Sequence, residues 1–144
     1  AEIARVGPVA SQARLVAASL RDSGDTAIVT VTTPEETPVN ETLEIEEELV
    51  ALLGRGPQAI VVNALLRDAV TRKDLDAVEA HAGPPVVTAL RRRHDRAALQ
   101  AGQLRRLRRG AQAPVVTLPS ITAHAIGPDE IATLAADLGR RLAG

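Results

Sequence analysis

The stretch TAIVTVTTPEETPVNETLEIEEEL, residues 26–49, decides the fold. It opens with a short β-branched segment, Thr26–Thr32, whose flanking turn residues predict a strand buried on both faces. Thr37 is then expected to cap a helix that starts at Pro38, where a missing backbone N–H costs nothing, and that runs to about Leu53. A strand that turns directly into a helix is typical of the first half of a βαβ unit.

The second half of this unit is QAIVVNALL, which begins at Gln58 and predicts a second buried strand. The short connections favour parallel strands joined by a right-handed crossover. We expect the helix between them to bury one apolar face and to expose most of its glutamates. The apolar face consists of Ile45, Leu49, Leu52 and Leu53, and the solvated side contains Glu44, Glu46, Glu47 and Glu48.

The same periodicities predict four more helices and one more strand. The helices are Pro8–Arg21 (apolar face Val9, Ala13, Val16, Ala17, Leu20), Lys73–His81 (ended by GPP at Gly83–Pro85), a basic helix Leu90–Arg109 (Leu99, Leu104 and Leu107 inward) and Pro128–Leu142 (apolar face Ile131, Leu134, Ala135, Leu138, Leu142), and the third strand is Pro114–Pro119. This order predicts one α/β domain over residues 1–144, with a parallel sheet of about three strands layered between helices. Three strands are few for such a sheet, which therefore looks unfinished.

Composition limits the function classes. The chain has 144 residues, 45% of them apolar, and a net charge of −1, which favours neither nucleic acid nor membrane as a partner. It contains no apolar run of about 20 residues and no signal-like start, so we expect a cytoplasmic protein. Cysteine is absent, which excludes disulfides and thiolate metal sites, and the three scattered histidines (His81, His94, His124) do not indicate a metal site.

Ligands of parallel α/β sheets bind beyond the carboxyl ends of the strands. This rule selects three loops: residues 32–37, 63–66 and 119–127. A phosphate-binding P-loop needs glycines and a Lys followed by Ser or Thr, but the only lysine, Lys73, precedes Asp74. The chain therefore has no P-loop of its own.

At these loops the sequence resembles a known family. The segments TAIVTVTTPEETPVNETLEIEEEL and QAIVVNALL, then the basic helix and PVVTLPSITAHAIGPDEI, are similar in order and spacing to the C-terminal half of the ArsA/GET-type ATPases. These are the anion-transporting and tail-anchored-protein-targeting branch of the deviant Walker A P-loop NTPases, which include MinD. The resemblance implies that residues 1–144 are the C-terminal half of a larger ATPase domain.

In that family the N-terminal half carries the P-loop, the Mg²⁺-binding and water-activating aspartates and the switch loops. The resemblance therefore implies ATP as the ligand, with Mg²⁺ held by residues outside this chain, and no catalytic residue within it. Asn63 would recognise the adenine edge, because an amide offers both a donor and an acceptor. Pro119 would pack on the purine face, and Pro34 and Glu35 would lie near the nucleotide and the dimer seam. The chain alone is predicted to be inactive.

Each of these residues also has a structural interpretation, which stays open. Asn63 would satisfy backbone groups of a turn, Pro119 would end a strand, and Pro34 and Glu35 would form the exit from a strand into a helix. The arginines of residues 91–109 would form a solvated helix face or be neutralised within the molecule by the glutamates of residues 35–48.

Two functions follow. The first is an ATPase of the ArsA/GET type, which implies a missing P-loop half, a dimer of identical or related subunits, and an anion or a membrane protein as its client. The sequence has no counterpart of the family's zinc-binding or arsenite-binding cysteines, and it lacks the methionines of a client groove. The alternative is a non-catalytic α/β module that binds a protein partner through its acidic and basic faces.

Overall fold

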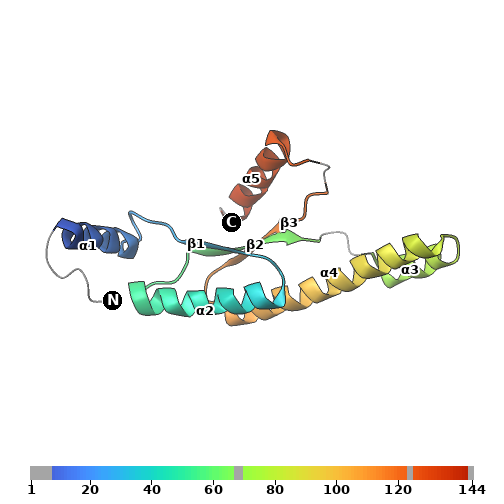
Figure 1. Cartoon of the computed structure of the whole chain (residues 1–144), viewed down its shortest axis with the longest axis horizontal. Coiled ribbons are helices and arrows are strands. Elements are labelled where there is room, and N and C mark those ends of the chain that lie inside the picture. The colour runs from blue at the N-terminus through green and yellow to red at the C-terminus, as the bar shows by residue number, and fades with distance from the viewer. Residues whose placement is uncertain (1–7, 67–69, 123–124, 143–144) are drawn as a thin grey trace.

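The computed structural model describes residues 8–66, 70–122 and 125–142 (Figure 1). Its elements are α1 (Pro8–Arg21), β1 (Val29–Thr32), α2 (Glu36–Leu53), β2 (Ala59–Leu65), α3 (Arg72–Glu79), α4 (Pro84–Gly110), β3 (Val115–Pro119) and α5 (Pro128–Leu142). The order of helices and strands is the predicted one. Residues 67–69, between β2 and α3, lie outside the described ranges.

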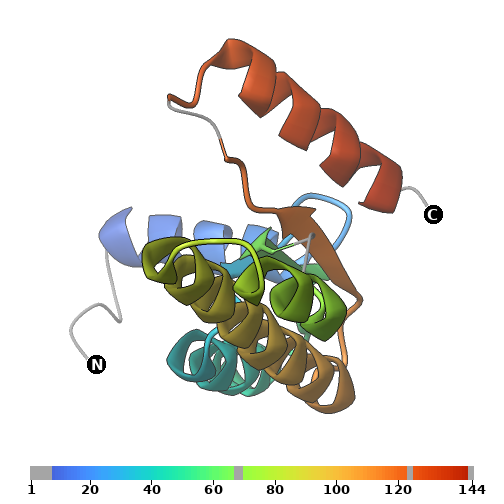
Figure 2. The same ribbon diagram turned by 90° about the vertical axis from the view of Figure 1, so that its right-hand side faces the viewer.

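The three strands form one parallel sheet in the order β1-β2-β3. Val31 pairs with Val61, and Val61 pairs with Val116, so the three strands are in register across the sheet. Both crossovers run in the same direction, and right-handed crossovers then place α2 and α4 on the same face. Figure 2 shows these two helices on one side of the sheet and α5 on the other. The predicted α/β fold, a small parallel sheet flanked by helices, is confirmed.

The core lies between β2 and the pair α2 and α4. Its buried residues are Val39, Ile60, Val62, Leu104 and Leu107. Each fully buried aliphatic side chain contributes about 1.5–3 kcal/mol by leaving water. The central strand and the two crossover helices therefore hold the described part of the chain together.

The edge strand β1 differs from the prediction. It covers only Val29–Thr32, and Val29 and Val31 are exposed, whereas Thr32 is buried beneath α2. The expectation of a strand buried on both faces is wrong for β1, because α5 packs on β3 and leaves the outer face of β1 open. It is correct for the first four residues of β2, which have a strand on either side.

Helix α2 begins earlier than predicted. Glu35 is the N-cap residue, in an extended conformation and without a side-chain cap, so the predicted cap at Thr37 is wrong. Pro38 still lies in the first turn, where backbone N–H groups have no helical partner. The predicted core face is also rotated. Ile45 and Leu52 are exposed, Leu49 and Leu53 are half-buried, and the buried residues are Val39, Thr42 and Glu46.

Glu46 was expected in solvent, but only 5% of its surface is exposed. Its carboxylate accepts backbone N–H bonds from Gln112 at 3.1 and 3.0 Å and from Ala113 at 2.7 Å. Burying a carboxylate is costly unless it is hydrogen-bonded. These contacts satisfy it and fix the turn between α4 and β3 onto α2.

Helix α4 starts at Pro84, with Gly83 as its N-cap, so the GPP sequence begins this helix and does not only end the one before it. Proline is tolerated at the first helical positions because their N–H groups bond nothing in the helix. Leu104 and Leu107 are buried as predicted, but Leu99 is exposed. Leu99 lies two residues after the buried Ala97, which at 3.6 residues per turn places it on the opposite side of the helix.

The terminal helices bury little. In α1 only Ala10 is buried, and Val9 and Val16 of the predicted inner face are exposed. In α5 no residue is fully buried, although Leu134 and Leu138 are half-buried. Both helices occupy their predicted residues, but their apolar faces are largely uncovered.

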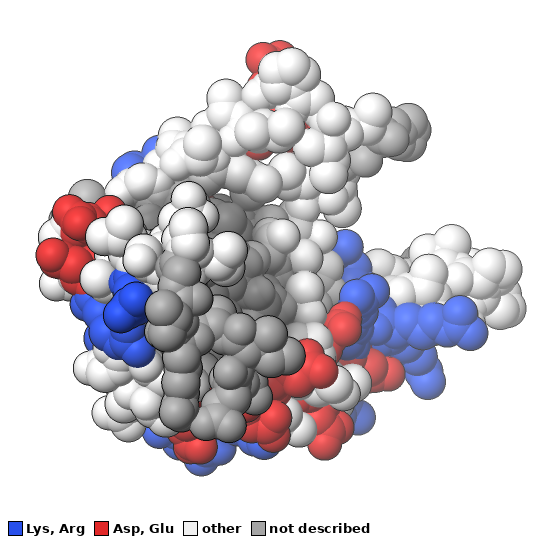
Figure 3. Space-filling model, turned by 60° about the vertical axis from the view of Figure 1, so that its left-hand side comes forward, with Lys and Arg blue, Asp and Glu red and all other residues white. Residues whose placement is uncertain are grey.

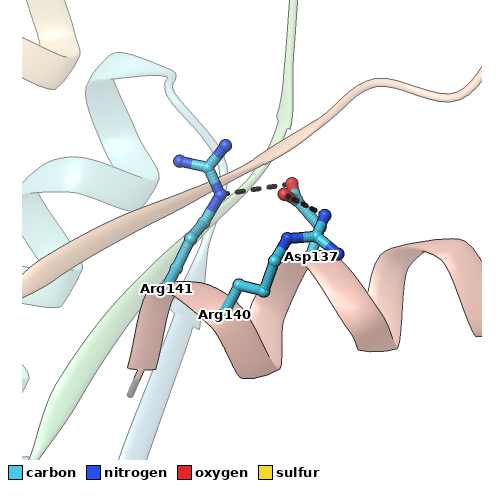
Figure 4. Close-up of polar contacts among 3 residues, drawn as sticks. All are labelled: Asp137, Arg140 and Arg141. Atoms are coloured by element: carbon cyan, nitrogen blue, oxygen red, sulfur yellow. Dashed lines mark hydrogen bonds and ion pairs between the residues drawn. The ribbon is translucent and has the colours of Figure 1, made fainter. Parts of the chain in front are cut away.

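The last turns of α5 are held by ion pairs, drawn in Figure 4. The Asp137 carboxylate accepts from Nη2 of Arg140 at 3.2 Å and from Nε of Arg141 at 3.2 Å. An acidic residue one turn before arginines stabilises a helix by about 0.2–0.5 kcal/mol per pair. The two arginines also lie at the negative end of the helix dipole.

Candidate functional site at the carboxyl edge of the sheet

Parallel pairing brings the carboxyl ends of β1, β2 and β3 to one edge of the sheet, as the sequence predicts. The first two predicted loops, residues 32–37 and 63–66, lie within the described ranges. In the third loop, residues 123 and 124 lie outside them. The candidate site is therefore built from the ends of β1 and β2 and from the start of the third loop.

The turn after β1 is held tightly. The Glu35 N–H donates to the Thr33 carbonyl at 2.9 Å, and Pro34 is fully buried. Glu35 itself is exposed, and its Oε1 accepts from Nη2 of Arg96 at 3.3 Å. Pro34 thus anchors the exit from β1, and Glu35 connects that exit to α4.

Asn63 lies at an irregularity of the central strand. The β2–β3 register shifts between Val62 and Leu65, and Ala64 has a φ of 58°, a conformation that costs an L-residue roughly 1–2 kcal/mol. The Ala64 N–H donates to Oδ1 of Asn63 at 2.8 Å. This bond is the turn-stabilising role expected as the structural interpretation. Among the described residues the Asn63 side chain has no other partner, so its NH₂ group is available.

A groove opens between β1, α2 and the end of β2. It has a volume of about 300 Å³, at the lower end of small-molecule sites. Its lining combines threonine hydroxyls, aliphatic side chains, one amide and one carboxylate: Thr30, Val31, Thr32, Thr33, Pro38, Glu41, Thr42, Ile45 and Asn63. Such a wall can pack against a flat apolar group and hydrogen-bond its edge.

Of the four predicted site residues, only Asn63 lines this groove. Pro119 is the last residue of β3 and pairs with Leu65, so it lies on the other flank of β2. There the Ser120 N–H donates to the Leu65 carbonyl at 2.8 Å. Pro119 is half-buried and shares the edge of the sheet with Asn63, but not the groove.

Sequence analysis missed Gln100, which positions the second loop. This buried α4 residue accepts through Oε1 from the Leu66 N–H at 3.0 Å. The signal in the sequence was an amide side chain on the line of α4 that also carries Ala97, Leu104 and Leu107. The threonines that line the groove were missed as well, although alternate threonines in β1 mark the side that faces α2.

The edge of the sheet offers little to a phosphate. The N-terminus of α2 points there, and helix N-termini attract anions, but its cap and first residue are Glu35 and Glu36. The single lysine, Lys73, lies on α3. Within residues 8–66, 70–122 and 125–142, no cluster of acidic or histidine side chains is arranged to hold a metal ion.

No protein-family model and no curated protein matches this chain. The chain's own geometry defines its class, an α/β protein with a three-stranded parallel sheet flanked by helices and a groove at the carboxyl edge of that sheet. None of the helices in the described ranges is long and apolar enough to cross a membrane.

Proposed function

We propose that this chain is the adenine-holding side of the nucleotide cleft of an ArsA/GET-type ATPase. The observation that carries the proposal is Asn63, a half-buried amide at the carboxyl end of the central parallel strand, which opens on a groove of about 300 Å³. This is the edge at which parallel α/β sheets bind their ligands. The proposal also depends on the resemblance of the three strand-and-loop segments to that family.

The amide has the chemistry that adenine recognition requires. Its NH₂ group donates to a ring nitrogen, and Oδ1, which already accepts from Ala64 at 2.8 Å, keeps a second lone pair for the exocyclic amine. The bond to Ala64 orients the side chain before any ligand arrives, which lowers the entropic cost of binding. The apolar groups of Pro38 and Ile45, both on α2, give the purine an apolar wall in place of aromatic stacking.

The phosphates would be held elsewhere. Two carboxylates, those of Glu35 and Glu36, stand at the start of α2, and they disfavour a triphosphate at that helix end. The P-loop, Mg²⁺ and the aspartate that activates water would come from residues outside this chain. Phosphoryl transfer depends on positioning and electrostatic stabilisation of the phosphates, so the chain alone hydrolyses no ATP. In the complete protein, ATP would close a dimer of identical or related subunits, with an anion or a membrane protein as client.

Asn63→Ala tests the proposal, and Asn40→Ala is its matched control. Asn40 is the other asparagine of the chain and lies on α2, away from the groove lining. In nucleotide titrations of the complete gene product, Asn63→Ala should weaken ATP binding by about three- to tenfold and reduce the preference for ATP over GTP. Asn40→Ala should change neither.

Circular dichroism of both variants separates loss of binding from loss of fold. Equal ATP affinities for Asn63→Ala and the parent protein would remove Asn63 from the site. ATP turnover by this chain alone, if it persisted through purification and fell in Asn63→Ala, would contradict the assignment of the phosphates to another segment.

The second candidate function is a non-catalytic module that binds a protein partner. The many exposed charges of α2 and α4 favour it. This module would bind its partner with or without nucleotide, whereas an ATPase of the proposed type would couple the two.

A further inference from the structure

Two polar side chains of α4 bond the chain just after β2. Oε1 of Gln100 accepts from the Leu66 N–H at 3.0 Å, and Nδ1 of His94 bonds the Val70 carbonyl. Because a carbonyl oxygen only accepts, the hydrogen of the second bond lies on Nδ1. Leu66 follows β2 directly, and Val70 comes two residues before α3. Helix α4 therefore holds the chain on its way from β2 to α3 at two points.

The spacing along α4 explains why both side chains face the sheet. His94 lies three residues before the buried Ala97, and Gln100 lies three residues after it. Residues three or four apart share one side of a helix. Gln100 is only 4% exposed, and His94 is half-buried. The buried side of α4 thus continues past its apolar residues and carries polar groups at the carboxyl edge of the sheet.

The Gln100 bond lies just beyond the irregular end of β2. Ala64 has a φ of 58° there, and a residue keeps such a conformation only where its surroundings hold it. The first N–H group that α4 bonds, that of Leu66, comes two residues later. By holding this point, Gln100 also preserves the bond from the Ala64 N–H to Oδ1 of Asn63.

A third contact joins α4 to the loop after β1. Nη2 of Arg96 donates to Oε1 of Glu35 at 3.3 Å, and both side chains are more than half exposed. It is the one ion pair that the described residues contain between the glutamates of residues 35–48 and the arginines of residues 91–109. Acidic and basic side chains lie next to one another at several places in Figure 3, and exposed pairs contribute little. The loop after β2 is therefore the one that α4 positions.

We propose, on the basis of the function proposed above, that Gln100 and His94 are positioning residues of the candidate site. These two residues, the loop anchors, hold the loop after β2 so that the Asn63 amide is oriented before a ligand binds. Neither of them lines the groove. A site that is held in its binding conformation binds more tightly than one that adopts it only part of the time. Loss of either loop anchor should therefore weaken binding, while Asn63 still selects the base.

Hydrogen exchange of the complete gene product without nucleotide tests the anchoring itself. Gln100→Met removes the acceptor and keeps a side chain of similar length, so the Leu66 amide should exchange about tenfold faster or more. Gln103→Met is the matched control, because Gln103 is also half-buried on α4 but its Oε1 has no hydrogen-bond partner among the described residues. This control should leave the exchange of the Leu66 amide unchanged. Equal exchange in Gln100→Met and the parent would overturn the proposal.

Nucleotide titrations of the complete gene product test the effect of the loop anchors on the site. Gln100→Met and His94→Leu should each weaken ATP binding by about three- to tenfold and leave the preference for ATP over GTP as in the parent. His94→Asn keeps an N–H donor close to the position of Nδ1, so it should recover most of the affinity that His94→Leu loses. A role of His94 in packing alone would give the opposite order, because leucine fills the space of the ring better than asparagine.

His81→Leu is the matched control for His94, because Nδ1 of His81 bonds the Ala77 carbonyl only four residues earlier, at 3.1 Å. This control should bind ATP like the parent. Circular dichroism checks that each variant is folded, and the two loop anchors are tested separately, so that an unfolded variant of one leaves the other as the test.

Comparison with Asn63→Ala separates the positioning role from the proposed function. If Asn63→Ala weakens ATP binding but the variants of both loop anchors do not, the positioning role is wrong and the proposed function stands. If none of these variants changes ATP binding, both are wrong. Weaker binding in all of them, with the ATP preference altered only in Asn63→Ala, is the result that we expect.

Discussion

Strands β1 and β2 are similar in sequence and unlike in environment. Both are rich in β-branched residues, and Val31 pairs directly with Val61 across the ladder. Yet Val61 is 2% exposed and Val31 is 65% exposed. The difference shows that the position of a strand in the sheet decides how far its side chains are buried. Strand β2 has a strand on each side, whereas β1 has one neighbour and an uncovered outer face.

At the candidate site the two strands have different roles: β2 holds a side chain in place, and β1 leaves the groove accessible. Asn63 is carried by the buried central strand, which fixes its position, while the groove in front of it is formed by the accessible edge strand β1 and by α2. A ligand site needs both a rigid scaffold and an accessible surface. The largest loss of stability is therefore expected from substitutions in the central strand.

The largest effect is expected at Ile60, which is fully buried in β2. Ile60→Ala should lower the free energy of unfolding by about 2–5 kcal/mol, because it removes buried methyl groups and leaves a cavity. Ile45→Ala, on the exposed part of α2, should cost well under half as much. Urea unfolding of both variants measures the difference, and equal losses would contradict the assignment of the core to β2.

Replacing either valine of the Val31–Val61 pair by threonine compares the environments of β1 and β2 directly. Val61→Thr should cost about 1–3 kcal/mol, because it buries a hydroxyl group among apolar side chains. Val31→Thr should change the free energy of unfolding by no more than about 0.5 kcal/mol, because water solvates the added group. The two substitutions are chemically identical and lie on paired residues, so a similar cost at both would show that the outer face of β1 is covered in solution.

The smallest effect is expected far from the sheet, in the exposed capping box of α3. The Asp74 carboxylate accepts two hydrogen bonds from Thr71, one from its hydroxyl at 2.6 Å and one from its backbone N–H at 2.9 Å. These bonds lower the pKa of Asp74 below 3.8. The carboxylate therefore stabilises α3 above its unfolded pKa, and this contribution is lost as the pH falls through the lowered folded value.

Asp74→Asn should remove that part of the acid sensitivity of α3 and leave β2 unaffected. Hydrogen exchange of the α3 amides against pH measures it, with Asp76→Asn, also on α3, as the control. If Asp74→Asn and the parent chain gave identical pH profiles, the capping box would not be the cause of the acid sensitivity of α3.

Local patterns in the sequence predicted every element in the right order, because their signals lie within a few residues. Helix α5 occupies its predicted residues, and Thr26–Thr32 contains β1. The errors lie where a distant segment decides the environment. Glu46 was expected in solvent because it belongs to a run of glutamates, but the N–H groups of Gln112 and Ala113, more than 60 residues away, bury it.

The candidate site was likewise predicted only in part. The rule for parallel sheets selected the edge and the residue Asn63, because the ends of the strands follow from the sequence. The bond from Ala64 to Asn63, the support of Leu66 by Gln100, and the separation of Pro119 from the groove all depend on the register between strands and on the docking of α4. Neither register nor docking leaves a local signature in the chain.

By itself the sequence determined the succession of helices and strands, the parallel class of the sheet and the absence of a phosphate-binding loop, since each depends on spacing and residue type along a short segment. Only the tertiary structure decided that β1 is an open edge, that Glu46 is buried, and that the acidic helix α2 and the basic helix α4 lie side by side. The physical reason is that burial and ion pairing are set by neighbours in space, and these become neighbours only when the crossovers place α2 and α4 on one face of the sheet.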